Sequence, residues 1–519
     1  MHIRWVSSKE GFGHLPRTPP TTLKEEQLLK KWKSSGYFWL PDRPEDKLPG
    51  EISFIPGQAI YISIIGSFKS LPQFGVSDLC KVINASLANG LKCTIVDSIY
   101  FPETFFTKEK PFFRTRFQSK LLIAGIHFEC IENFSIEEIG IKFSKVNNWL
   151  ECPYSIKFID NNYEETNFQF KPVALNVPTQ FQKKSFVLST FCERTIPLPD
   201  QDPGGEISWT YQYVLIIHPS EPQNLLWFFK LTLSLRNFFM FLIGSNVCTL
   251  ELSGSLPSLK SKPDDNPREV RVYAPVYFPR LEENNEGFST YYSKIGKKFN
   301  TITETWFEKY NDIEEVMRGY AELVQNDGAQ KESVFLRIVQ ILEHFYGYLF
   351  KESKKYLPKK YWKYIQNEFQ YALDGLLKKN EGPAPNQSEF MTEDLKKTIL
   401  NRISSLNKKS FRSCLTELFN GIPKSLLLSI FRNPSEDIEK VVGDFLKSVE
   451  NTRNYLTHFD AKLKRRCFSE RDLERATLIC WAVLNYWIAK TLNFEEKTSS
   501  NIAMISLQAL FIVSPPDKF

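Results

Sequence analysis

An arginine and a histidine lie five positions apart late in the chain, in the stretch Thr452-Arg-Asn-Tyr-Leu-Thr-His458. Arg453 supplies a permanent, planar cation that can hold two phosphate oxygens, and His458 can titrate near neutral pH. RNA carries its own nucleophile, the 2′-hydroxyl, so a proton acceptor and a cation are nearly sufficient to break its phosphodiester without a metal ion. The spacing therefore indicates a candidate ribonuclease site, in which Asn454 could position the phosphate or the imidazole.

A purely structural interpretation uses the same residues. Arg453 would pair with a local carboxylate such as Glu450, and His458 would cap a helix. An isolated arginine–histidine spacing is a weak signal, because such pairs also arise by chance. The elements around the pair must therefore decide between the two interpretations.

The segment before the pair predicts a long amphipathic helix. Asn433-Pro-Ser-Glu436 is typical of a helix start, with Asn433 as N-cap, and an apolar stripe follows it. Arg453 falls inside that stripe, so we expect its charge to meet a carboxylate, a phosphate or a partner subunit. His458 lies about 140° farther round a regular helix. Both side chains can share a pocket only if the helix ends or bends near residues 456–457, or if two chains build the pocket.

Chain length and the pattern of predicted strands and helices indicate a multidomain α+β protein. The 519 residues are 42% hydrophobic, enough for two or three packed domains. We expect a β-rich N-terminal domain over residues 1–285, a helical connector over 286–328 and an all-α bundle over 329–519. Short strands are predicted at 59–65, 93–96, 121–128, 154–158, 211–217 and 270–277. Helices are predicted at 225–244, 291–324, 334–350, 361–379, 395–418 and 469–492.

Positive charge is concentrated in the C-terminal part of the chain. Residues 331–519 contain 30 Lys and Arg against 22 Asp and Glu, while the whole chain carries a formal charge of +6. The basic group directly after the pair is the best candidate for holding RNA phosphates: Lys462, Lys464, Arg465 and Arg466. A second group between residues 354 and 363 interleaves lysines with Tyr356, Tyr361 and Trp362. For each group, an ordinary solvated helix surface is an equal alternative.

Cysteine usage and the termini favour a cytoplasmic protein without a membrane anchor. The nine cysteines are scattered and form no CxxC pair, so neither a disulfide framework nor a zinc site is expected. The N-terminus lacks the apolar core of a signal peptide, and the apolar stretches at 225–243 and 502–513 are better explained as buried core. We expect no metal and no cofactor.

Residues in both halves carry a resemblance to a known family. Thr452-Arg-Asn-Tyr-Leu-Thr-His458, together with Phe335-Leu-Arg-Ile-Val-Gln-Ile-Leu-Glu343, resembles the Apea-like group of HEPN ribonucleases. Gly36-Tyr-Phe-Trp-Leu-Pro41, Leu48-Pro-Gly-Glu-Ile-Ser-Phe54 and Asn148-Trp-Leu150 are similar to the N-terminal domain of ApeA anti-phage proteins. The resemblance places Arg453, Asn454 and His458 at the motif positions, and gives Glu343 a family position without a role.

The resemblance implies a bacterial defence protein that acts by abortive infection. Its HEPN domain would form a homodimer, with a higher oligomer left open, and would cut RNA, with tRNA as a candidate, after a phage-derived trigger. The alternative is a non-catalytic protein that binds nucleic acid or a phage component and uses the HEPN bundle for dimerisation.

Overall fold

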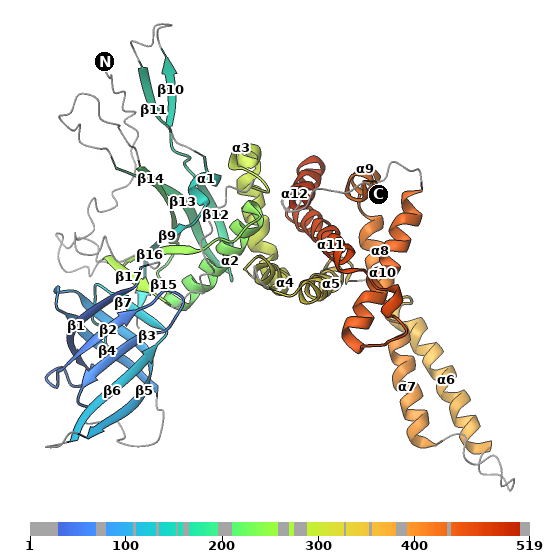
Figure 1. The fold of residues 1–519 in the computed structure, drawn as a ribbon, viewed down its shortest axis with the longest axis horizontal. Helices are drawn as coiled ribbons and strands as arrows, with labels where there is room; N and C mark the ends of the chain where they lie inside the picture. Colours follow the sequence, from blue (N-terminus) through green and yellow to red (C-terminus); the bar gives the residue numbers. More distant parts are fainter. Residues whose placement is uncertain are drawn as a thin grey trace. The chain divides into compact units, whose positions relative to one another are not determined.

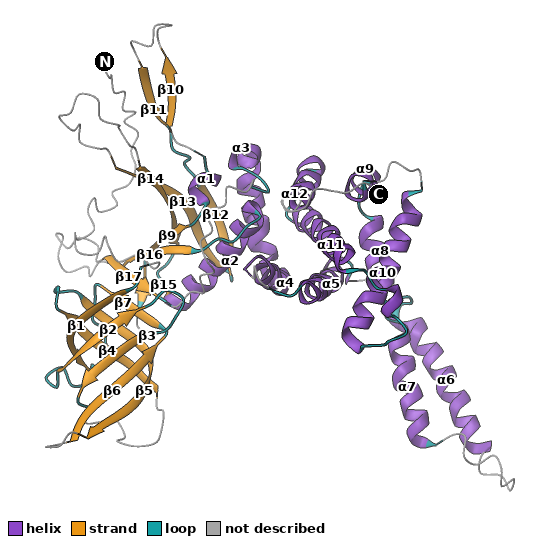
Figure 2. Ribbon diagram, viewed as in Figure 1, coloured by secondary structure: helices purple, strands orange, loops and turns teal. Residues whose placement is uncertain are grey.

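The computed structural model describes residues 30–68, 79–106, 111–130, 134–151, 154–158, 166–195, 210–257, 269–274, 288–325, 329–351, 355–379, 392–432 and 437–508. Contacts within the chain divide it into two compact units, Met1–Asn311 and Asp312–Phe519. Strands dominate the first unit (Figure 1), whereas every described element of the second unit is helical (Figure 2). The predicted class, a β-rich N-terminal region followed by an all-α region, is confirmed.

Antiparallel strands form one large sheet in the first unit. Its thirteen strands follow the order β12-β13-β14-β9-β16-β17-β7-β5-β4-β1-β2-β3-β6. Two short ribbons, β10–β11 and β15–β8, stand apart from it. The strands are β1 (Trp32–Trp39), β2 (Leu48–Phe54), β3 (Ile60–Ile65), β4 (Leu79–Leu87), β5 (Lys92–Phe106), β6 (Pro111–Ser119), β7 (Leu121–Ala124), β8 (Ser135–Ile136), β9 (Glu138–Phe143), β10 (Tyr154–Phe158), β11 (Thr166–Phe170), β12 (Asn176–Phe181), β13 (Lys184–Thr195), β14 (Thr210–Pro219), β15 (Gln223–Asn224), β16 (Thr249–Ser255) and β17 (Glu269–Tyr273).

One end of the sheet closes into a barrel. Strand β6 pairs with β3 on one side and with the second half of β5 on the other, which completes a ring through β4, β1 and β2 (Figure 1). The first half of β5 pairs instead with β7, so this long strand joins the barrel to the open part of the sheet. Closure leaves the ring without an exposed edge strand.

Alternating side chains explain the barrel strands. Along β3 the isoleucines at 60, 62 and 64 are buried, whereas Tyr61 and Ile65 face outward. Gly36 and Gly50 are register partners on β1 and β2. A Cβ atom on Gly36 would lie 2.5 Å from the Ser86 carbonyl oxygen, so glycine permits the close approach of neighbouring strands at this point.

Helix α2 (Leu225–Ile243) packs on the open part of the sheet. Asn224 caps it by accepting a 2.9 Å hydrogen bond from the Trp227 backbone N–H. Phe239 contacts Phe143 of β9, and Trp306 donates a 2.9 Å hydrogen bond to Ser234. By length and composition α2 could cross a membrane, but 72% of its most apolar stretch is buried inside the unit. The prediction of a buried core helix at 225–244 is confirmed.

The remaining helices follow in chain order. They are α1 (Val146–Trp149), α3 (Tyr292–Ile295), η2 (Gly296–Lys298), α4 (Phe299–Gln325), α5 (Lys331–Leu349), α6 (Lys359–Lys379), α7 (Glu393–Leu406), α8 (Phe411–Asn420), α9 (Lys424–Phe431), α10 (Ile438–His458), η4 (Lys464–Arg466), α11 (Glu470–Thr491) and α12 (Glu496–Gln508). Helix α11 is the core of the second unit, because most of its side chains are buried and it packs against α5, α9 and α12.

Three predicted boundaries are corrected. The segment 395–418 is two helices, α7 and α8, because Asn407 leaves the helix and Ser410 begins a new one. The Asn407 carbonyl accepts from the Tyr356 N–H, and its side chain bonds to the Leu357 backbone. The strand expected at 121–128 ends at Ala124. The strand expected at 270–277 ends at Tyr273, and residues 275–277 lie outside the described residues.

Candidate active site

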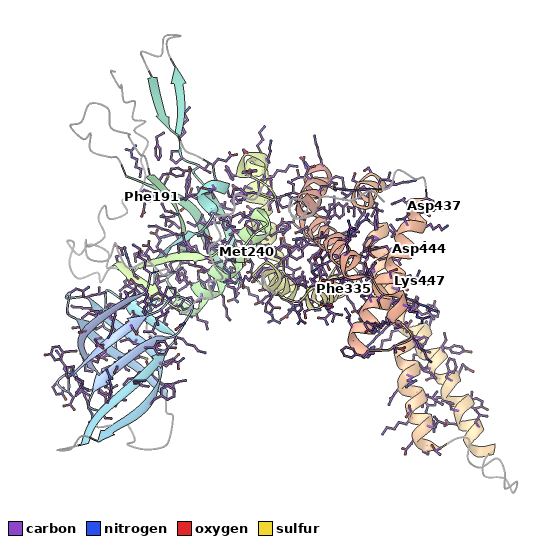
Figure 3. All side chains as sticks on the ribbon, viewed as in Figure 1. Phe191, Met240, Phe335, Asp437, Asp444 and Lys447 are labelled. Carbon is purple, nitrogen blue, oxygen red and sulfur yellow. The ribbon has the colours of Figure 1, made fainter. Side chains whose placement is uncertain are left out.

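Helix α10 carries the arginine–histidine pair. Its N-cap is Asp437, whose carboxylate accepts a 3.2 Å hydrogen bond from the Lys440 backbone N–H. The labelled side chains Asp437, Asp444 and Lys447 mark the helix from its beginning in Figure 3. The predicted cap, Asn433 with Pro434 and Glu436, lies outside the described residues. The predicted apolar stripe is present, with Ile438, Val442, Leu446 and Val449 buried.

Three neighbours hold the Arg453 guanidinium. Its Nη2 lies 3.6 Å from Glu343 Oε2 on α5, and its Nη1 donates a 3.2 Å hydrogen bond to Asn454 Oδ1. The guanidinium also lies over the ring of Phe411, 5.1 Å from the centroid, at the first residue of α8. Arg453 therefore meets a carboxylate, as its place in the apolar stripe predicts. That carboxylate belongs to Glu343, not to Glu450 as the purely structural interpretation expected. The Arg453 side chain keeps 31% of its surface exposed, so a phosphate can still reach it.

His458 lies on the same helix but points elsewhere. Helix α10 continues without a break to His458, and Thr457 Oγ1 donates a 2.7 Å hydrogen bond to the Arg453 carbonyl. The helix ends one residue past the expected 456–457, and His458 is still helical, so the end comes too late to turn His458 toward Arg453. The two side chains remain about 140° apart around the helix axis. Within the described residues, the exposed His458 imidazole makes no hydrogen bond and no ion pair.

The residue after the histidine ends the helix in an unusual conformation. Phe459 has φ 54° and ψ 32°, and its N–H donates a 2.7 Å hydrogen bond to the Tyr455 carbonyl. Glycine or asparagine usually occupies this left-handed position, because a β-carbon is crowded there. The Phe459 ring is also 76% exposed. A bulky aromatic residue is thus unfavourable at this position in an isolated chain for two separate reasons.

The predicted RNA-binding residues form an exposed basic loop. Lys462, Lys464, Arg465 and Arg466 all face solvent, the last three in the 3-10 turn η4. The Phe468 N–H donates a 3.0 Å hydrogen bond to Thr452 Oγ1, beside Arg453. This bond joins the end of the loop to α10 beside Arg453. The four cations are therefore held close to the segment of α10 that carries the arginine–histidine pair.

A further set of polar contacts connects α5 with α8, the two helices that carry neighbours of Arg453. The Tyr346 hydroxyl donates a 2.7 Å hydrogen bond to Glu417, which also pairs with Lys409. Burial alone would raise the pKa of Glu417, but these two donors lower it below its usual range. The contacts join α5, which carries Glu343, to α8, which carries Phe411.

Sequence reasoning missed Phe411 and Glu417, because both fall within the segment read as one long helix. The available signal was Ser410, whose hydroxyl caps α8 by accepting from the Ser413 N–H. Serine before an apolar run is a common helix start. His344, beside Glu343, is exposed on α5.

Comparison with known proteins gives one result for each half of the chain. The family model for ApeA N-terminal domain 1 matches residues 33–306, and the model for the Apea-like HEPN domain matches residues 336–498. No curated protein and no solved structure matches the chain. The second model spans Glu343, Phe411, Arg453 and His458. The first alone covers more than half of the sequence, so the chain belongs to the ApeA family and is a HEPN protein of anti-phage defence.

Proposed function

We propose that this protein is a metal-independent endoribonuclease that cleaves RNA, with tRNA as a candidate substrate. The observation that carries the proposal is the placement of Arg453 and His458. Both lie in the last two turns of α10, inside the HEPN match, and the basic loop follows directly. HEPN domains are generally associated with ribonuclease activity.

The chemistry uses the 2′-hydroxyl of the substrate. The His458 imidazole accepts the 2′-hydroxyl proton, and the 2′-oxygen forms a bond to phosphorus. Arg453 donates to the nonbridging oxygens as negative charge develops on them. The bond from phosphorus to the 5′-oxygen breaks, and water protonates that oxygen. The products are a 2′,3′-cyclic phosphate and a 5′-hydroxyl end, and the imidazolium returns its proton to solvent.

Two copies of the chain build the site in this proposal. One α10 presents Arg453 and His458 on surfaces about 140° apart, too far round for both to act on one phosphate. A symmetric pair of α10 ends can place the arginine of one copy against the histidine of the other. The exposed Phe459 ring, directly after His458, is the apolar contact that such a pairing would bury.

Removing either side chain tests the chemistry. Arg453→Ala and His458→Ala should each reduce cleavage of total RNA in EDTA by at least about 100-fold, while circular dichroism stays native. His344→Ala, which removes an exposed histidine from α5, is the matched control and should cleave normally. End-mapping should find 2′,3′-cyclic phosphates. Full cleavage by both alanine variants would refute the proposal.

A non-catalytic binding protein is the second candidate. The observation that favours it is that Glu343 already engages Arg453, while His458 stands alone at the helix end. Such a protein would bind RNA or a phage component through the HEPN unit and leave the RNA intact. Wild-type protein that binds RNA in a salt-dependent manner but makes no new ends would support this candidate.

We further propose that the protein acts in the cytoplasm as a homodimer and that its β-rich unit responds to a phage-derived trigger. The support is the family membership and the division into two compact units.

A further inference from the structure

Helices α6 and α7 form an arm that leaves and rejoins the second unit at one point (Figure 1). Asn407, which is buried, closes the base of the arm. Its side chain accepts from the Leu357 N–H at 2.8 Å and donates to the Leu357 carbonyl at 2.9 Å. Farther out, Leu373 and Ile403 are buried between the helices, and Asp374 pairs with Lys396 at 2.6 Å. Helices α6 and α7 therefore pack against each other along the arm.

Three tyrosines line the outer surface of α6. Tyr361, Tyr364 and Tyr371 are 61%, 67% and 80% exposed. At 100° per residue they fall within an arc of about 80°, opposite the buried Leu373. The rise from the first to the last is about 15 Å. Aromatic residues bury large areas in cores and interfaces, so three of them exposed on one arc indicate a binding surface.

Positive charge borders these rings on one side. Residues 355–409 contain 11 Lys and Arg against 6 Asp and Glu. On the helix surface Lys360 lies about 20° beyond the arc and Lys363 about 80° beyond it on the same side, and both are exposed. Glu368 is the single acidic residue within the arc. Rings flanked by lysines are the pattern by which proteins hold single-stranded nucleic acid, since bases stack on the rings and cations contact the phosphates.

The base of the arm adjoins Arg453. Asn407 is followed by Ser410, which caps α8, and then by Phe411, whose ring lies under the Arg453 guanidinium. The Tyr356 hydroxyl lies 3.1 Å from Ser413 Oγ, so the segment that leads into α6 also contacts the first turn of α8. A chain lying along the arm would therefore lead toward Arg453.

We propose that the α6–α7 arm binds a single-stranded segment of the RNA substrate, with unpaired bases stacked on Tyr361, Tyr364 and Tyr371 and phosphates held by Lys360 and Lys363. The assignment rests on the proposed ribonuclease function and extends it, because it selects unpaired RNA and directs it to the site. A second copy of the chain fits less well, because pairing two such arms would bring lysines against lysines.

The test uses full-length His458→Ala protein, which does not cut, and a fluorescent 20-nucleotide single-stranded RNA. Changing all three tyrosines to leucine keeps the apolar surface but removes the rings, and should weaken binding at least about tenfold. Phenylalanine at all three positions should retain most of the affinity. Phe369→Leu, on a different side of α6, is the matched control. Glu368→Gln should tighten binding.

Two results would overturn the assignment. One is unchanged RNA affinity of the triple leucine variant. The other is a loss of dimer mass in that variant by analytical ultracentrifugation, which would assign the surface to a second copy. Failure of the ribonuclease proposal looks different. In that case the otherwise wild-type protein leaves RNA intact, whereas the tyrosine variants still differ from it in binding.

Discussion

Arg453 shows how neighbouring side chains fix the orientation of a guanidinium that lies within an apolar stripe. A guanidinium inside an apolar stripe is unfavourable unless its charge is matched, and Glu343, Asn454 and Phe411 together match it. All three restrict its orientation, whereas its exposed part stays available. His458 has the opposite character, because it stands in solvent beside a residue with unfavourable backbone geometry.

That neighbour, Phe459, supports a prediction about the residue itself. Phe459→Gly should raise the free energy of unfolding by about 1 kcal/mol, because glycine adopts the left-handed conformation without crowding and the ring buries little. RNA cleavage should fall in the same variant, since the proposed contact between copies is lost. Differential scanning calorimetry and a cleavage assay measure the two effects.

Phe459→Asn provides the control, because asparagine also tolerates this conformation. It should behave as the glycine variant does. A glycine variant with full cleavage activity would show that the ring has no functional contact.

The link between α5 and α8 supports a prediction at the level of elements. The pKa of Glu417 is lowered in the folded protein, so its ionised form contributes stability above the ordinary carboxyl range. That contribution is lost as the pH falls through the lowered value. Because 35% of the Glu417 side chain is exposed and solvent screens its charge, Glu417→Gln should lower stability at pH 7 by only about 0.5–1 kcal/mol, and the difference from wild type should shrink below about pH 4.

Thermal unfolding at the two pH values measures this effect. Tyr346→Phe removes one donor to Glu417 and should cost less on its own. Combining the two changes should cost less than their sum, because both act on one hydrogen bond. Additive losses, or a deficit in Glu417→Gln that persists in acid, would contradict the assignment.

Elements differed in how well their sequence predicted them. Strand β10 and helix α2 follow from local patterns and have the expected extents. The break between α7 and α8 was missed because the apolar spacing continues across it. Only the contact of Asn407 with Leu357, 50 positions away, shows why the chain turns there. Glu343 and Phe411 were not predicted as neighbours of Arg453, because the packing of α5 and α8 against α10 brings them there and no local pattern encodes that packing.

At the scale of the whole molecule, the sequence predicted a β-rich part and a helical part but not how the strands connect. Closure of the barrel depends on β6 pairing with both β3 and β5, and no local pattern encodes that choice. The spacing of Arg453 and His458 did predict that one regular helix would place the two side chains on different faces. An unbroken α10 keeps Arg453 and His458 on different faces, and the proposed function unites them through a second copy of the chain.

Mixing two inactive variants tests that arrangement. If Arg453 of one copy acts with His458 of the other, co-expressed Arg453→Ala and His458→Ala chains should regain about a quarter of wild-type cleavage. Random pairing makes half of the dimers mixed, and each mixed dimer keeps one intact site of two. Each variant expressed alone is the control. A mixture as inactive as its components would place both groups of a working site on one chain.

The base of the α6–α7 arm has a further consequence. Because Asn407 and Leu357 meet directly, the chain enters and leaves the arm at almost the same place. The segment between Leu357 and Asn407 can thus be deleted, and a short turn can replace it without moving α5, α8 or α10. The arm can therefore differ in length or sequence while the helices that carry Arg453 and its neighbours stay in place, so the proposed RNA selection and the proposed cleavage chemistry can change independently.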